Sequence, residues 1–192
     1  MKKILFGSFC IALSLATLAQ TKTPKTLGRY TSIDEKDCII VESSELEKDA
    51  EIDFLTMKCP SFGGYDVEIS GGDIRYNLKL SFEGKEIQTP SPSNFHDMGS
   101  KLIEWRYSRV KNAEGRNELK LWGLIYRINK TVEDDNGKQS TESTLHVVRL
   151  KGKDSCLVAN ISSKTRQKLS QEQMALLSAE DESLPCLSTD QE

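Results

Sequence analysis

The clearest pattern along the chain is an alternation of apolar and polar positions on both sides of Gly71-Gly72. Residues 65–70 and 73–82 each place apolar side chains at every second position, which is the period of a β-strand with one buried face. Two adjacent glycines between such runs favour a tight hairpin. The pattern therefore predicts a hairpin whose two loop residues are Gly71 and Gly72, with Ile69 opposite Ile74.

Two further hairpins follow from the same period. Residues 101–110 and 118–128 flank a turn at 112–115 and place Ile103, Trp105 and Tyr107 on the same face as Trp122, Leu124 and Tyr126. The strand from 118 then meets Asn136-Gly137, a strong turn signal, and returns as 141–150. With those two residues in the turn, Tyr126 is expected opposite Val147.

The chain also predicts a strand pair near its start and a helix near its end. Residues 38–43 and 53–59 are β-rich and would pair around Lys48 and Asp49, and a short strand is expected at 156–161. Ser170 and Gln173 form the pattern of a capping box. In the helix that follows, Leu169, Gln173, Leu176 and Leu177 would share one side.

Together these elements predict a mainly β (α+β) fold. We expect a single antiparallel sheet of about seven strands, closed toward a barrel or a sandwich, and covered by one C-terminal helix. Residues 29–188 would form one domain, preceded by a flexible lead-in at 20–28. The sequence shows no internal repeat of a structural unit.

The first 19 residues have the pattern of a secretory signal peptide. Lys2 and Lys3 precede an apolar run from Ile4 to Leu18, and Ala19 provides a small residue for cleavage. The apolar run is short for a membrane span, and no later segment reaches that length. We therefore expect a periplasmic or secreted protein with no membrane span after removal of the signal.

Charge and cysteine content refine this expectation. Removal of the signal takes away two lysines and no acidic residue, so the formal charge changes from −3 to −5. A mildly acidic protein of this kind lacks the basic surface that binds nucleic acid. Four cysteines remain after Cys10 is removed, an even number in an oxidising compartment, so two disulfides are predicted. Three connectivities are open, and the strand pattern favours Cys38–Cys59 and Cys156–Cys186. A zinc site is the alternative, but no Cys-x-x-Cys pair supports it, and no cofactor or metal is predicted.

Two segments are candidates for binding. The turn at 60–65 places Phe62 and Tyr65 beside two glycines, where an aromatic tip could be exposed, although an ordinary turn needs no function. The longest irregular segment, 83–100, contains Phe95, His96 and Met98. Loops of this length are often interaction sites, and a plain connector is the alternative.

Other features are explained by structure alone. Trp105, Tyr107, Trp122 and Tyr126 form an aromatic stripe that is typical of core packing, because polar residues alternate with it. The paired carboxylates lie in a turn and near a helix end. His96 and His146 are the only imidazoles, and no nucleophile elbow accompanies them, so catalysis has little support.

Several short motifs resemble one family. They are Asp37-Cys38, Cys59-Pro-Ser-Phe-Gly-Gly-Tyr-Asp-Val67, Leu102-Ile-Glu-Trp105 and the terminal Cys186. At these positions the chain resembles a family of small exported proteobacterial proteins that have no assigned activity. The resemblance implies export and a shared fold. In size, compartment and disulfide-bonded β character the chain is also similar to periplasmic lysozyme inhibitors, an analogy without a matching motif.

Three functional hypotheses follow. The first is an exported, non-catalytic envelope protein that binds a protein or glycan partner through the 83–100 loop or the 60–65 turn. The second is a periplasmic hydrolase with a site assembled from scattered residues, one version of which uses His96 or His146. The third is a structural envelope component or an inhibitor-like protein.

Overall fold

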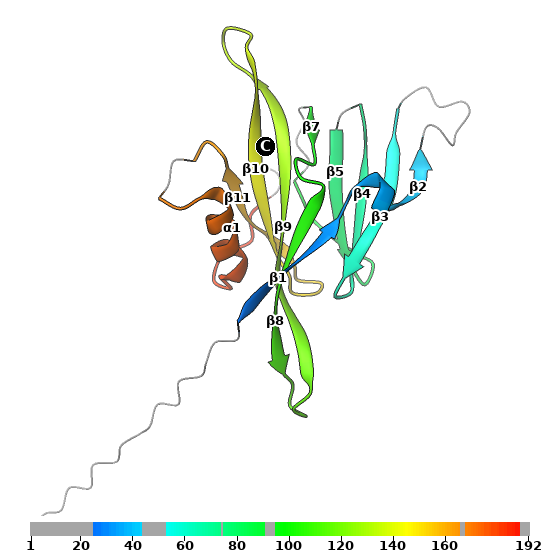
Figure 1. Cartoon of the computed structure of the whole chain (residues 1–192), viewed down its shortest axis with the longest axis vertical. Helices are drawn as coiled ribbons and strands as arrows, with labels where there is room; N and C mark the ends of the chain where they lie inside the picture. The colour runs from blue at the N-terminus through cyan, green and yellow to red at the C-terminus, as the bar shows by residue number, and fades with distance from the viewer. Residues whose placement is uncertain (1–24, 44–52, 74, 91–94, 166–167, 189–192) are drawn as a thin grey trace, which may run out of the picture.

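The computed structural model describes residues 25–43, 53–73, 75–90, 95–165 and 168–188 and shows a curled β-sheet with one helix against its outer side (Figure 1). The elements follow in the order β1 (Thr26–Ser32), η1 (Glu35–Asp37), β2 (Ile39–Ser43), β3 (Leu55–Phe62), β4 (Tyr65–Gly72), β5 (Arg75–Phe82), β6 (Lys85–Ile87), β7 (His96–Asp97), β8 (Leu102–Lys111), β9 (Asn117–Glu133), β10 (Gln139–Arg149), β11 (Cys156–Ser162) and α1 (Gln171–Glu180).

The strands form one eleven-stranded sheet whose main path is β1-β8-β9-β7-β5-β4-β3-β2. Strand β10 pairs with β9, β11 pairs with β10, and β6 pairs with β5. One pairing is parallel, between Arg75 of β5 and His96 of β7. The expectation of about seven strands in a purely antiparallel sheet is therefore wrong. Strands β6 and β7, of three and two residues, are too short to show an alternating pattern.

The sheet curls into a half-barrel around its main core. Buried side chains of this core come from β3, β4, β5, β8 and β9, and also from the end of β10 and the start of β11. Trp105 lies at the centre and is fully buried, with Phe62 and Tyr65 against its ring. The predicted core role is confirmed for Trp105 and Tyr126, which is 1% exposed.

The helix α1 packs on the other side of β9, β10 and β11 and encloses a second, smaller core. The predicted capping box is present: the Ser170 hydroxyl accepts from the Gln173 amide, and the Gln173 side chain accepts from the Ser170 amide. The predicted packing side is only partly right: Leu176 packs against the second core, but Leu177 is 58% exposed and the fully buried helix residues are Ala175 and Ala179. A Cβ on Gly123 would lie 2.9 Å from the Ala179 Cβ, so this close approach needs small residues on both surfaces.

The hairpin between β4 and β5 has a different turn from the predicted one. Gly72 pairs with Arg75, so the turn follows the two glycines and includes Asp73, whose φ is 49°. Ile69 consequently faces Leu78 rather than Ile74. The register moved by an even number of residues, so the apolar face is the predicted one. The glycines are needed within the strand: a Cβ at Gly71 would lie 2.0 Å from the Arg75 carbonyl oxygen.

The hairpin between β9 and β10 differs from its predicted register by one residue. The Gly137 amide donates to the Asp134 carbonyl, and the Asp134 amide donates to the Lys138 carbonyl. These hydrogen bonds close a loop that is longer than the two-residue turn expected for Asn136-Gly137. Gly137 lies in this loop with a φ of 76°. Tyr126 consequently pairs with His146 and not with Val147. This shift exchanges the two faces of β10 and places His146 in the interior.

A β-bulge changes the third hairpin. The register between β8 and β9 shifts between Arg106 and Tyr107, so that Tyr107 pairs with Leu121. Leu121 packs against the main core, whereas the Trp122 indole donates to the Ser108 hydroxyl. The predicted common face is confirmed for Trp105 and Leu124, which are paired and fully buried, but the bulge interrupts it before Trp122.

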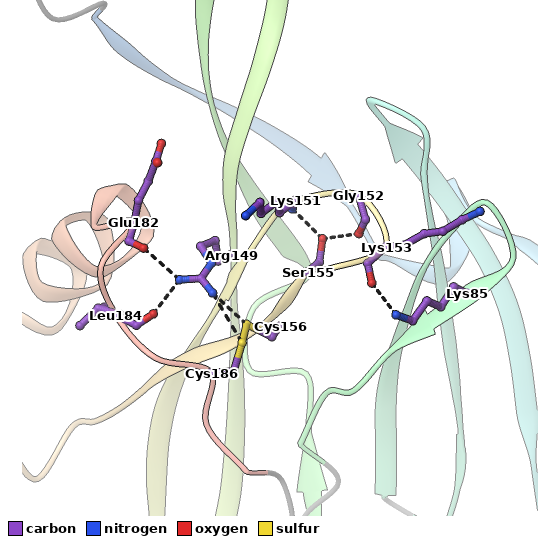
Figure 2. The surroundings of a disulfide bond; sticks show 10 residues. All are labelled: Lys85, Arg149, Lys151, Gly152, Lys153, Ser155, Cys156, Glu182, Leu184 and Cys186. Carbon is purple, nitrogen blue, oxygen red and sulfur yellow. Dashed lines mark hydrogen bonds between the residues drawn. A yellow bond between two sulfur atoms is a disulfide. The ribbon is translucent and has the colours of Figure 1, made fainter.

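Both predicted disulfides are present. Cys38 and Cys59 join β2 to β3, and Cys156 and Cys186 join β11 to the segment after α1. The Arg149 guanidinium donates to the carbonyl oxygens of Glu182 and Leu184 and lies 3.4 Å and 3.5 Å from the two sulfurs of the second bridge (Figure 2). It thereby holds the C-terminal segment beside α1.

Two disulfides are typical of a protein that folds outside the cytoplasm. In the part of the chain that is described, no helix combines the length and apolarity needed to cross a membrane. The predicted signal peptide and the centre of the predicted 38–59 hairpin at Lys48 and Asp49 lie outside the described residues. Strand β1 begins at Thr26, within the segment predicted as a flexible lead-in.

The glycines at the β4–β5 turn give a stability prediction. A Cβ at Gly72 would lie 1.9 Å from the Asp53 carbonyl oxygen, so Gly72→Ala should lower the free energy of unfolding by roughly 2 to 4 kcal/mol. Gly115→Ala is the matched control, because that glycine has a φ of 75° in open space and its substitution should cost about 1 kcal/mol. Urea unfolding of both variants measures the difference, and equal losses would contradict the register.

Candidate functional site

The two aromatic side chains of the 60–65 turn, which were candidates for an exposed tip, pack against the main core, as in an ordinary turn between strands. The Phe62 ring makes edge contacts with Trp105 and Tyr107 at centroid distances of 5.8 Å and 5.7 Å. Tyr65 is 3% exposed, and its hydroxyl accepts from the Gly152 amide and lies 3.0 Å from the Ser155 hydroxyl. These two aromatic residues therefore close one end of the half-barrel.

Two parts of the segment 83–100, the strands β6 and β7, are integrated into the sheet. Ile87 is 2% exposed and pairs with Leu80, and His96 is 2% exposed within β7. Phe95 remains 48% exposed, with the Arg75 guanidinium 4.5 Å above its ring. Met98 is half-buried and packs against the main core. The five predicted binding residues thus lie in different surroundings, and Met98 is the one that lines a pocket.

This pocket, here called the end pocket, has a volume of about 240 Å³. Its apolar walls come from β3, β4, β5 and the segments that flank β1 and β7. The apolar lining residues are Ile33, Leu55, Met57, Ile69, Tyr76 and Met98. Strands with buried faces provide most of these walls, so the pocket is a continuation of the core that remains open to solvent.

The rim of the end pocket is acidic. Asp34, Glu35, Asp97 and Lys101 contribute three carboxylates and one ammonium group. The Lys101 ammonium lies 3.0 Å from an Asp34 carboxylate oxygen and donates a hydrogen bond that lowers the pKa of Asp34. Because Lys101 is engaged by Asp34, the carboxylates of Glu35 and Asp97 give the rim a negative potential, which attracts cations at short range.

Two other hollows are less suited to binding. The groove over the polar face of β3, β4 and β5 is crossed by an ion pair between Lys79 and Glu68. The hollow beside Trp122 contains Lys120, which lies over the indole and pairs with Glu182, and Arg149, which holds the C-terminal segment. In each of these two hollows, several of the charged side chains are already engaged within the protein.

The imidazoles lie in the interior. His146 is 1% exposed, stacks on Tyr126 at 5.1 Å, and has its Nδ1 2.8 Å from the Asn160 side-chain oxygen. Burial lowers the pKa of His146 to about 4. A ring this enclosed is neutral at physiological pH and inaccessible to a substrate.

Among the described residues, no three of the types His, Cys, Asp and Glu cluster as metal ligands.

Sequence reasoning found part of the end pocket. Met98 came from the search for long loops, and Ile69 and Tyr76 from the alternating face. It missed Asp34, Asp97 and Lys101, because charged residues at a sheet end carry no periodic signal and only the curl brings them together.

No family model, curated protein or solved structure matches the chain. The function must therefore be argued from the geometry of the chain itself.

The buried imidazole of His146 predicts a pH dependence of stability. Its pKa is near 4 when folded and 6.5 when unfolded, so below pH 6.5 the unfolded chain binds more protons. Stability from this group should fall as pH decreases from 6.5 and be reduced by about 3 kcal/mol near pH 4. Urea unfolding at several pH values should show a shallower decline for His146→Phe than for the wild type. Identical slopes would contradict the assignment.

Proposed function

We propose that the chain is an exported, non-catalytic envelope protein that binds a basic partner protein, and that the end pocket accepts an apolar side chain of that partner. The observation that carries this proposal is the combination of apolar walls and an acidic rim at one pocket. An apolar side chain flanked by lysine or arginine residues is the complementary ligand.

The energetics of such a site are favourable. Burial of one leucine- or phenylalanine-sized side chain contributes roughly 1.5 to 3 kcal/mol. Most of the walls lie on strands, and the Cys38–Cys59 disulfide fixes β2 beside them, so little of the receptor has to be ordered on binding. The acidic rim would mainly accelerate encounter with a basic protein and make binding sensitive to salt.

A protein partner is favoured over a glycan. Sugar sites commonly present flat aromatic faces, but the apolar walls of the end pocket are mainly aliphatic, with Tyr76 as their one aromatic residue. The version of the hydrolase hypothesis that uses a histidine needs an accessible imidazole, and both histidines are at most 2% exposed. The hypothesis of a structural envelope component does not explain why an apolar pocket is open to solvent.

The test uses charge reversal at the rim. The oxidised protein, Glu35→Lys/Asp97→Lys and Glu114→Lys/Glu118→Lys would each be immobilised and exposed to envelope extract in about 50 mM salt. The control pair lies on the β8–β9 hairpin, which projects away from β2 and β3 in Figure 1, and it carries the same change of charge.

We expect the wild type and the control to retain the same basic protein, identified by mass spectrometry, and the rim variant to retain roughly tenfold less. Met98→Asp should also lose it, because a carboxylate would enter the apolar walls. Undiminished capture by both pocket variants, or capture of acidic proteins or glycans alone, would contradict the proposal.

A further inference from the structure

Strand β2 ends the main path of the sheet and presents an unusual surface. Within the described residues it pairs with β3 alone. Three consecutive apolar residues on it are exposed: Ile39 by 74%, Ile40 by 40% and Val41 by 45%. Exposed sheet edges are commonly blunted by lysine, proline or bulges. Strand β2 contains no lysine or proline, and its register shift lies between Ile40 and Glu42, beyond the Ile39–Ile40 pairs. An apolar open edge of this kind is a template for another strand.

The edge is also held in place. The Cys38–Cys59 disulfide joins the start of β2 to β3 with a Cα–Cα distance of 4.3 Å. Ile39 pairs with Lys58 and Ile40 with Met57, whose side chain is buried in the main core. A strand fixed in this way loses little freedom when a further strand is added, which favours binding.

The charges around β2 favour a basic strand as its ligand. Four carboxylates lie on β2 or in the turn before it, on Asp34, Glu35, Asp37 and Glu42. Lys101 pairs with Asp34, and Lys36 and Lys58, which lies opposite Ile39 on β3, are the ammonium groups beside the other three carboxylates, so the net charge stays negative. A second copy of the chain would bring the same acidic groups into contact, which disfavours pairing of β2 with itself. A basic segment is complementary.

The edge and the end pocket are continuous. Asp34 and Glu35 line the end pocket and also a shallow depression that includes Cys38 and Ile40. A ligand lying along β2 therefore reaches the acidic rim without leaving the surface.

We infer that β2 binds an extended basic segment of the partner as an added strand. This inference rests on the proposed function, and it specifies the backbone conformation and the charge of the segment that carries the apolar side chain into the end pocket. Main-chain hydrogen bonds to the edge would give affinity, and the rim would select lysine or arginine.

The test uses a fluorescent nine-residue peptide of alternating lysine and valine and the oxidised, full-length secreted chain. Binding is followed by fluorescence anisotropy, and hydrogen exchange reports on the amides of residues 39–43. Two control peptides replace every lysine by glutamate or N-methylate the three central amides, which removes strand pairing and keeps charge and side chains.

The variants separate the two proposals. Ile39→Lys adds a cation to the edge, outside the end pocket, and should weaken peptide binding at least tenfold. Leu177→Lys is the matched control on the exposed side of α1 and should leave binding unchanged. The lysine–valine peptide should slow exchange at 39–43, and neither control peptide should do so.

Three results would overturn the inference. The first is binding that survives Ile39→Lys but is lost in Glu35→Lys/Asp97→Lys, which would leave the end pocket as the whole site and the proposed function intact. The second is no binding, or equal binding of the N-methylated peptide. The third is a concentration-dependent dimer that Ile39→Lys abolishes, which would make a second copy the occupant of the edge.

Discussion

The packing of Trp105 inside the curled sheet is the interaction on which the rest of the structure depends. Its ring is fully buried on β8, and its indole N–H donates to the Thr31 hydroxyl of β1 at 2.9 Å. Phe62 and Tyr65, on either side of the β3–β4 turn, lie against the same ring. One side chain therefore links strands from both halves of the sheet, and a flat sheet would expose it.

The second layer depends on the long strand β9. Strand β9 pairs with β10 and also with β7 and β8. It therefore connects the half-barrel to the strands β10 and β11, against which α1 packs. On that side the contact between Gly123 and Ala179 allows α1 to approach closely, and Arg149 with the Cys156–Cys186 bridge holds the segment after it. A short helix with little apolar surface of its own is stabilised in this way by its connections as much as by burial.

Sequence reasoning predicted the parts of the fold that have a local signal. The period-two runs identified the main hairpins, the spacing of Cys38 and Cys59 in two facing strands identified their bridge, and Ser170 with Gln173 identified the helix start. Register could not be predicted, because it depends on turn geometry: a loop longer by one residue at Gly137 moved His146 to the interior. Two-residue strands and the acidic rim depend on the curl, and no local pattern encodes them.

The end pocket and the exposed edge of β2 are neighbouring features, and each combines apolar side chains with carboxylates. Both require that the sheet closes around Trp105, since this closure orients β3, β4 and β5 with β2 at their margin. The most direct measurement is a NOESY spectrum of the oxidised protein. The account predicts cross-peaks from the Trp105 indole to Thr31, Phe62 and Tyr65 together. An indole that shows cross-peaks to β9 alone would mean that the sheet is open and would contradict the account.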